Sequence, residues 1–487
     1  MLNRSIEKYQ LWYFAGFAII SIIAMMAAVV LREFLLLVVP FLILFAYITF
    51  IDFKKIFFLL IFLLPLSVEI QIGSLGTDLP TEPLIVALMF AFFLLIAARP
   101  NLIPYPFLKH PIIVTLLVHL AWMAFIIMHA ENTIVSLKFV LAKTWYIVTF
   151  VFVGGLILNN VDHLKKFFWL IFIPLSLLVI QTLVRFATYG FDFEFVNEPM
   201  FPFFRNHVNY AAMITIFYPF IFLAATWYKK GSFKRRIIQF AKVLYLVGIY
   251  FSYTRACFLA LFLAGVAYVV INYRLLAWGF RIGVAVLIGA VAYLSINNNY
   301  LQLAPDYSKT IHHKNFADHL TATIELQDVS SMERVYRWVS AFHMIQDRPI
   351  TGFGTGNFYP YYQRYTVSDF QTYTSDNEER STVHNYFLLT LVEQGIVGLL
   401  LFLGLTLAIF HYGEKGYLAE KDKQKRQIIL TVMLSMVIIY TNLMLSDLVE
   451  VDKTGGLFFM NVALLVNLLV GNFSVKEKKV ELETKNL

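Results

Sequence analysis

The chain has 487 residues, of which 59% are hydrophobic and only 14% are charged. Soluble domains are roughly 45–50% apolar and about 25% charged, so this composition excludes an ordinary soluble enzyme and predicts a polytopic membrane protein. The net charge of +8 is not a nucleic-acid footprint, because the basic excess lies in short segments between apolar runs.

Apolar runs long enough to cross a bilayer follow one another along the chain. A spanning helix needs about 20 apolar residues, with roughly 17–25 allowed. The first run is too long for a signal-peptide core and has no A-x-A-like site after it, so we expect a retained span. The candidate spans are 11–31, 34–51, 56–70, 83–98, 111–128, 144–158, 167–187, 207–228, 237–253, 255–272, 275–296, 384–411, 428–446 and 455–471.

Basic residues are unevenly distributed between the two sides of these spans. With the amino terminus in the cytoplasm, the cytoplasmic segments hold Lys54 and Lys55, the run KKGSFKRR at 229–236, and the lysine-rich tail. The short outer loops hold few basic residues, as the positive-inside rule requires. One outer segment, from about 297 to 383, is large, and long loops are exempt from this rule.

These spans and loops divide the chain into four parts. Residues 1–296 form an amino-terminal transmembrane bundle, 297–383 the large outer loop, 384–472 the carboxy-terminal transmembrane helices, and 473–487 a basic cytoplasmic tail. We therefore predict an all-α polytopic membrane protein with about 12–14 transmembrane helices and one large outer loop that contains helices.

The large outer loop carries a folded element. The stretch SMERVYRWVSAFHMIQ at 331–346 has helical spacing, and Pro349 with the glycines after it predicts a turn. Arg334 lies at the edge of the apolar face, and Arg337 lies further toward the polar side. We expect this helix to pack on the outer ends of the spans. Its apolar face comprises Met332, Val335, Trp338, Val339 and Phe342.

Four arginines and one histidine are predicted to lie on the same outer surface. Arginine binds phosphate oxygens through two parallel hydrogen bonds and stays charged, so this group suggests a lipid-linked pyrophosphate ligand. The histidine opens a helix, where the helix dipole and nearby arginines disfavour imidazolium, and it could accept a proton from a hydroxyl nucleophile. The residues are Arg205, Arg255, Arg334, Arg337 and His384.

Each of these residues also has a structural interpretation. Arg255 could anchor a span end at the interface, and Arg334 could be a solvated residue beside an apolar face. Arg337 is better explained as structural, and Arg205 lies in an aromatic stretch typical of an interfacial belt. His384 could form hydrogen bonds at the start of the helix without a catalytic role.

Glu393 lies inside the span that His384 opens, nine residues further along, which is about 13 Å on the helix axis. At that distance it cannot orient His384, and we favour a hydrogen bond to a neighbouring span. Gly395 and Gly398 are interpreted as close-packing positions. The candidate carboxylates for orienting His384 are Asp376, Glu378 and Glu379.

No metal site is predicted. The segment HHKNFADHL at 312–320 is rich in histidine, but its spacing fits no standard ligand pattern. We interpret it as a solvated loop.

Three segments in the second half of the chain carry motifs. HNYFLLTLVEQGIVGLLLF at 384–402 contains the pattern H-N-x-x-L-x-x-x-x-E-x-G-x-x-G, which resembles a signature of the O-antigen ligase and O-antigen polymerase superfamily. SYTRACFLAL at 252–261 resembles its arginine motif, and ERVYRWVSAFHMIQDRPITGFGTGNF at 333–358 resembles its loop motif. The order of the motifs fits as well. The resemblance covers roughly 205–402.

The resemblance implies a membrane glycosyltransferase of GT-C-like architecture in the bacterial inner membrane, independent of metals and cofactors. Its active site would face the periplasm and take a glycan from undecaprenyl pyrophosphate. Arg255 and Arg334 would hold the pyrophosphate, with Arg205 and Arg337 as further candidates. His384 would assist the acceptor hydroxyl.

Three further motif residues are candidate supports for this site: Glu393, Asn385 and Trp338. The expected partners are the lipid-linked glycan donor, an acceptor and membrane lipid, with no nucleic acid.

The acceptor remains open between three classes. They are a lipid A-core saccharide for a ligase, another lipid-linked repeat for a polymerase, and a protein hydroxyl for an oligosaccharyltransferase. We favour the ligase. A lipid-linked glycan flippase is the alternative from a different class, but transporters typically place their polar groups near the midplane in repeated halves. Here the candidate groups are predicted at one face.

Overall fold

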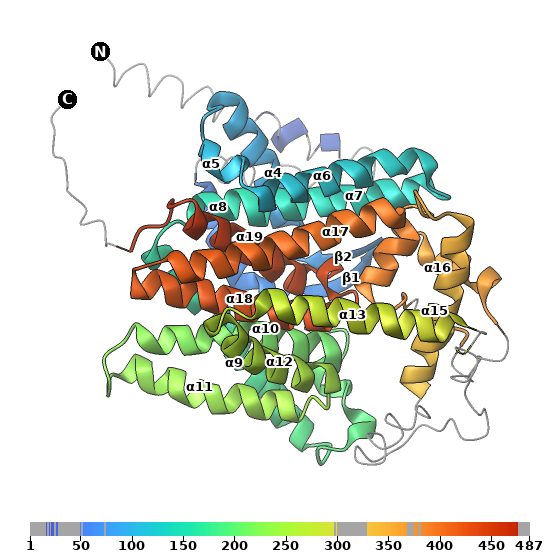
Figure 1. Ribbon diagram of the computed structural model, residues 1–487. Coiled ribbons are helices and arrows are strands. Elements are labelled where there is room, and N and C mark those ends of the chain that lie inside the picture. The colour runs from blue at the N-terminus through green and yellow to red at the C-terminus, as the bar shows by residue number, and fades with distance from the viewer. Residues whose placement is uncertain are drawn as a thin grey trace.

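The computed structural model describes residues 52–72, 75–296, 299, 329–367, 375–377 and 381–475, with isolated positions between 16 and 49. These residues form a bundle of helices with one short hairpin (Figure 1). The predicted all-α membrane fold is confirmed. The predicted spans at 11–31 and 34–51 lie outside the described residues, apart from the isolated positions.

Eight helices in the described part of the chain are long and apolar enough to cross a membrane. Seven predicted spans between 83 and 446 coincide with them closely, and the eighth, at 144–158, starts earlier than expected. The helices are α4 (Thr81–Ala98), α6 with η3 (Pro111–His129), α7 with η4 and α8 (Thr133–Ile157), α9 (Val161–Ala187), α10 (His207–Thr226), α12 (Arg255–Asn272), α17 (Tyr386–Ala419) and α18 (Lys423–Leu443).

Three more predicted spans are helices as well. They are α11 (Phe233–Tyr250), α13 (Leu276–Ser295) and α19 (Asp452–Leu469). A short helix, α5 (Tyr105–Leu108), lies between α4 and α6.

The predicted span at 56–70 is not a single helix. Helix α3 (Phe53–Leu63) continues only into a short turn, η2 (Leu64–Leu66), and an antiparallel hairpin of β1 (Val68–Ile72) and β2 (Leu75–Leu79) follows. Pro65 lies in that turn and removes a backbone donor, while the β-branched residues of VEIQI favour a strand. The apolar run does not cross as one helix, because the helix ends at Leu63 and the last residues of the run, from Val68, are extended.

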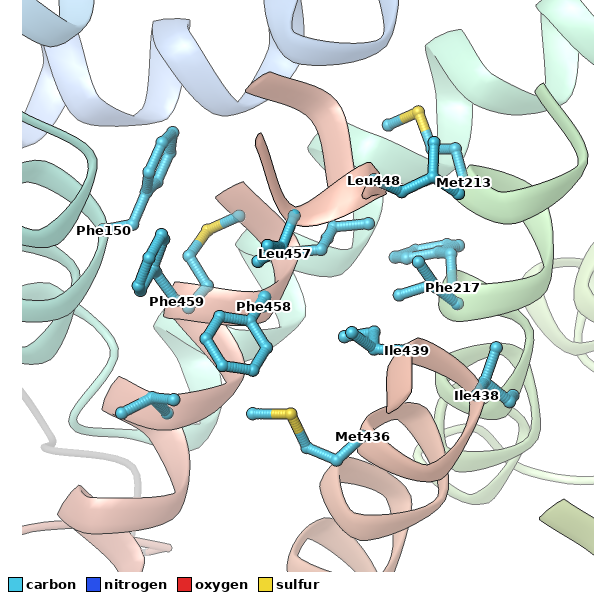
Figure 2. Packing of buried hydrophobic residues seen from close by; sticks show 14 of the residues in the cluster. Phe150, Met213, Phe217, Met436, Ile438, Ile439, Leu448, Leu457, Phe458 and Phe459 are labelled. Carbon is cyan, nitrogen blue, oxygen red and sulfur yellow. The ribbon is translucent and has the colours of Figure 1, made fainter. Parts of the chain in front are cut away.

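Helix α19 is the centre of the bundle. It is buried on nearly every face, including its few polar residues, as expected for a largely apolar helix inside a bundle. Figure 2 shows Phe458 and Phe459 of α19 among side chains from neighbouring helices, including Phe150 and Met436. At Gly456 an added Cβ would lie 3.1 Å from the Phe150 ring, so the helix packs closely there.

The loop elements lie at one end of the bundle, beside the start of α17 (Figure 1). They are α15 (Val329–Asp347), α16 (Phe358–Tyr361) and η8 (Tyr362–Tyr365). The glycine-rich segment between α15 and α16 runs along a break in α17. The amide of Phe353 donates to the carbonyl of Val392 at 3.0 Å, and the amide of Ile396 donates to the carbonyl of Pro349 at 2.8 Å.

Gly395 makes the break in α17 possible. Its φ of 67° interrupts the helix, and an added Cβ there would collide with the carbonyl oxygen of Ile350. The expectation that Gly395 is a close-packing position is confirmed. The loop and α17 are thereby joined through their backbones.

Helix α15 confirms the predicted loop helix, but its buried face differs from the expectation. Met332 and Val339 are buried, whereas Phe342 is 47% exposed. Arg337, expected toward the polar side, is only 5% exposed. The pattern of apolar residues alone missed this, because Arg337 is accommodated by an ion pair that it forms with Glu333 on the same helix.

Candidate active site at the start of α17

His384 lies just before α17, held by the cap of that helix. The Asn385 side chain accepts from the amide of Leu388 at 3.0 Å, as a helix N-cap does. Its amide nitrogen also donates to the carbonyl of Met444 at 3.1 Å, just beyond α18. Asn385 thus joins the start of α17 to the end of α18, and His384 takes a left-handed φ of 54° beside it.

The surroundings of His384 keep its imidazole neutral. Burial, together with the positive charges of Arg334 and Arg337, lowers its pKa to about 3. At neutral pH the ring therefore has a free nitrogen lone pair. A neutral ring can accept a proton, as the proposed base role needs.

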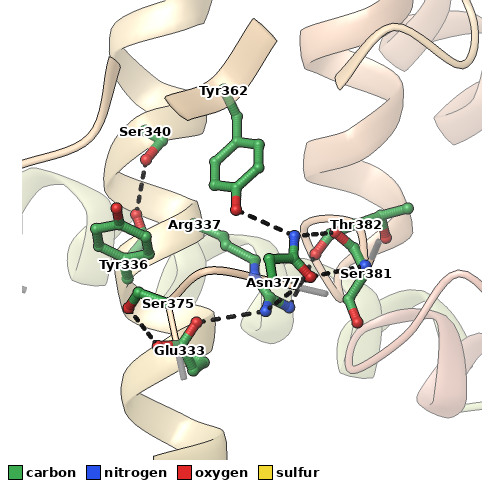
Figure 3. Close-up of polar contacts among 9 residues, drawn as sticks. All are labelled: Glu333, Tyr336, Arg337, Ser340, Tyr362, Ser375, Asn377, Ser381 and Thr382. Atoms are coloured by element: carbon green, nitrogen blue, oxygen red, sulfur yellow. Dashed lines mark hydrogen bonds and ion pairs between the residues drawn. The ribbon is translucent and has the colours of Figure 1, made fainter. Parts of the chain in front are cut away.

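The segment 381–383 before His384 is held by side chains of α15 (Figure 3). The indole nitrogen of Trp338 donates to the carbonyl of Val383 at 2.9 Å. The Arg337 guanidinium donates to the carbonyl of Thr382 at 3.4 Å. Trp338 therefore has a supporting contact within one residue of His384.

Arg337 is engaged by protein partners. Its guanidinium lies 3.3 Å from the carboxylate of Glu333, and both side chains are more than nine-tenths buried. Glu333 also accepts from the hydroxyl of Ser375 at 2.6 Å (Figure 3). A buried arginine paired in this way favours the structural interpretation of Arg337, while Arg334 remains the candidate for an anion.

Arg205 belongs to the same end of the bundle through Asp447. Thr382 donates its hydroxyl to the carboxylate of Asp447 at 2.9 Å, and the charge of Arg205 acts on that carboxylate. Burial is the larger effect and raises the pKa of Asp447. An acidic group and a basic group that are far apart in the sequence thus lie beside the segment that leads to His384.

Arg255 begins α12, and its neighbours place that helix start within the same region. The hydroxyl of Thr254 donates to the carbonyl of His207 at 3.4 Å, at the start of α10. The thiol of Cys257 lies 3.7 Å from the side-chain oxygen of Asn442, near the end of α18. The starts of α10 and α12 and the end of α18 therefore meet.

Glu393 does not bond a neighbouring span, contrary to the expectation. Its carboxylate accepts from the amide of Phe358 at 3.1 Å, so it holds the glycine-rich loop. The next residue makes the contact between spans instead: the side-chain oxygen of Gln394 lies 2.7 Å from the imidazole of His119 in α6. The glutamate of the motif is a structural link between α17 and the loop.

Sequence reasoning missed Asn377, Thr382, Asp447 and Lys453. Lys453 donates to the carbonyl of Ser67 at 2.9 Å and to the carbonyl of Phe203, two residues before Arg205. A lysine beside an aspartate at the start of a largely apolar helix is the one local signal that could have indicated it. The other three are ordinary loop residues, and nothing in their local sequence distinguishes them.

Most of the remaining candidate residues from the sequence lie outside the described part of the chain. Asp376 is exposed, and Glu378 and Glu379 lie outside the described residues. The histidine-rich segment 312–320 also lies outside them. In the described part of the chain, no group of three or more His, Cys, Asp or Glu side chains could hold a metal ion.

Comparison with known families gives a match that begins at about the middle of the chain. A family model described as O-antigen ligase matches residues 240–403. This match supports a relationship of residues 240–403 to the O-antigen ligase superfamily. The match spans Arg255, Arg334 and His384, while Arg205 lies before it. A search of curated proteins gave no match.

The similarity of residues 240–403 to this family indicates a general function. It supports a membrane enzyme of the ligase or polymerase type, resembling a glycosyltransferase. The substrates of such an enzyme are in general a lipid-linked glycan and an acceptor.

Proposed function

We propose that this protein transfers a glycan from undecaprenyl pyrophosphate to an acceptor hydroxyl at the periplasmic face of the bacterial inner membrane. The favoured acceptor is lipid A-core, which makes the protein an O-antigen ligase. The observation that carries the proposal is the neutral His384 beside Arg334 at the mouth of α17, within the matched domain. A neutral base next to a phosphate-binding group is what glycosyl transfer from a pyrophosphate requires.

The proposed reaction is a single displacement at the anomeric carbon. The acceptor oxygen forms the new bond to that carbon while the bond to the pyrophosphate oxygen breaks with its electron pair. His384 takes the hydroxyl proton. Arg255 and Arg334 stabilise the negative charge of the departing undecaprenyl pyrophosphate. The configuration at the anomeric carbon is expected to invert.

The charges around His384 link donor binding to base strength. In the absence of an anion, the arginines weaken the imidazole as a base. A bound pyrophosphate offsets the charge of Arg334 and raises the pKa of His384 toward the range of an effective base. The acceptor is then activated only when the donor is present, which limits unproductive hydrolysis.

The test uses purified full-length protein in detergent with an undecaprenyl-pyrophosphate-linked glycan and no nucleotide. Lipid A-core, a lipid-linked repeat and a serine-containing peptide are offered separately as acceptors, with and without EDTA. We expect wild type to transfer glycan to lipid A-core. His384→Gln should lose at least about 100-fold in kcat, and Arg334→Ala should chiefly weaken donor use.

The matched control is Arg364→Ala, which removes an exposed arginine from the same loop, where it stacks on Tyr361. This variant should retain wild-type turnover. Full turnover by His384→Gln would exclude the base role. Transfer to the lipid-linked repeat or the peptide alone would reassign the acceptor. Donor binding without transfer to any acceptor would favour a flippase, which a liposome translocation assay would then examine.

A further inference from the structure

The three residues before His384 are held through successive backbone carbonyls. This approach segment, residues 381–383, accepts hydrogen bonds at each position. Asn377 donates to the carbonyl of Ser381 at 3.0 Å, and the carbonyls of Thr382 and Val383 are bound by α15 as described above. Such a segment has lost its backbone freedom before any substrate arrives.

Asn377 connects the approach segment to the loop elements around it (Figure 3). Its side-chain oxygen accepts from the amide of Ser381 at 2.8 Å, while its nitrogen donates to the carbonyl of the same residue. That nitrogen also donates to the hydroxyl of Tyr362 at 3.1 Å. The oxygen lies 3.4 Å from the Arg337 guanidinium as well. One side chain thus ties the approach segment to both α15 and η8.

Only an amide meets these demands. It presents one acceptor and two donor hydrogens from a single planar group, and reversing it would set its NH2 against the Ser381 amide. A carboxylate would set a charge without a donor against the carbonyl of Ser381. Asn377 is 4% exposed and adopts a left-handed φ of 52°, which asparagine tolerates better than most residues. Its burial and its backbone conformation are both those of a side-chain amide held in one position.

We propose that Asn377 is a positioning residue for His384. It fixes the approach segment so that the imidazole stays at its place beside Arg334 when donor and acceptor bind. This inference rests on the base role proposed for His384. Asn377 touches neither substrate, and acts through the backbone of residues 381–383.

The first arm of the test measures backbone hydrogen exchange and needs no turnover. In Asn377→Ala, exchange of peptides covering 381–385 should rise about five- to tenfold, as expected from losing bonds to a buried segment. The control is Asn467→Ala. Asn467 is also a buried asparagine, which donates to the carbonyls of Gly155 and Leu158, in a different part of the bundle. That control should leave peptides covering 381–385 unchanged.

The second arm is a double-mutant cycle on turnover. Asn377→Ala alone should lower kcat about 10- to 100-fold, because small displacements of a reacting group are costly, with less than a threefold change in donor KM. In a His384→Gln background the same substitution should change the residual rate less than twofold. A general loss of stability would instead lower both backgrounds equally.

The two arms separate the possible failures. Unchanged exchange in Asn377→Ala, or an equal loss of kcat in both backgrounds, would overturn the positioning role. Increased exchange confined to 381–385 supports it. If wild type transfers no glycan while this local increase is present, the proposed function fails and the holding of the segment by Asn377 stands.

Discussion

Burial and the charges of two arginines on one turn of α15 together lower the pKa of His384. Arg334 and Arg337 both act on the imidazole, but Glu333 lies 3.3 Å from Arg337 and offsets its charge. Arg334 is the arginine proposed to bind the pyrophosphate, so donor binding would change its effect on the ring. The ion pair with Glu333 favours the structural interpretation of Arg337.

The pH dependence of turnover follows from the lowered pKa of His384. Because the pKa is about 3 in the free protein, the ring stays neutral as the pH falls below the ordinary histidine value of about 6.5. The acid limb of kcat/KM, which reports the free enzyme, should lie well below pH 6. The acid limb of kcat should lie at higher pH, because bound pyrophosphate raises the pKa.

The measurement is a pH–rate profile between pH 4 and pH 8, as far as the protein stays folded. An acid limb near 6.5 in kcat/KM would contradict the charge arrangement around His384. Arg334→Gln removes one of the charges and should move the limb of kcat/KM upward. The direction of that shift is independent of which acceptor is used.

The glycine-rich loop and the break in α17 form one structural element. Gly352, Gly354 and Gly395 all have positive φ, and the amide of Gly354 donates to the carbonyl of Glu393 at 2.8 Å. The carboxylate of Glu393 then holds the amide of Phe358. The glycines let the loop approach the break in α17, and Glu393 holds the loop there. Together they form one structural connection, here called the joint, between α17 and the loop that follows α15.

Substitution of Gly395 tests this joint. Gly395→Ala places a Cβ against the carbonyl of Ile350 and forces alanine into a left-handed conformation, which alone costs about 1–3 kcal/mol. We expect a clearly lower unfolding temperature in detergent and a loss of turnover.

Gly404→Ala is the matched control in the same helix. An added Cβ there meets only Thr115, at 3.8 Å, which is ordinary contact. This variant should unfold close to the wild-type temperature. Equal stability of the two variants would show that the joint contributes little.

At the scale of the whole molecule, the candidate site residues gather at one end of the helix bundle. The starts of α10, α12 and α17 and the end of α18 meet there, and α15 lies at the same end beside α17 (Figure 1). Lys453 connects the start of α19 to Ser67, just before the β hairpin, and to the segment before Arg205. One-sided placement favours a transferase that works at a membrane surface over a carrier with a midplane site.

Single-cysteine labelling tests which side this end faces. Cys257 is the only cysteine and is buried, so Cys257→Ala provides a background. A cysteine in place of the exposed Gln346 of α15 should react with a membrane-impermeant maleimide in spheroplasts. A cysteine in place of the exposed Lys230 should react only after permeabilisation. The reverse pattern would put the candidate site in the cytoplasm.

Properties that depend on local sequence were predictable. The lengths of the apolar runs gave most of the spans, because hydrocarbon thickness sets helix length. The motif residues indicated the superfamily, which the match to residues 240–403 supports. The predicted span at 56–70 was wrong, because apolar content does not distinguish a helix from an extended strand when a proline intervenes.

Contacts between segments far apart in the chain could not be predicted from the sequence. Lys453 bonds carbonyls between 250 and 388 residues away, and Glu393 bonds an amide 35 residues before it. The burial of Arg337 and the bonds of Asn377 also depend on which segments meet. Spans and motifs follow from short stretches of chain, whereas partners of buried polar groups follow from packing, because any nearby donor or acceptor can satisfy them.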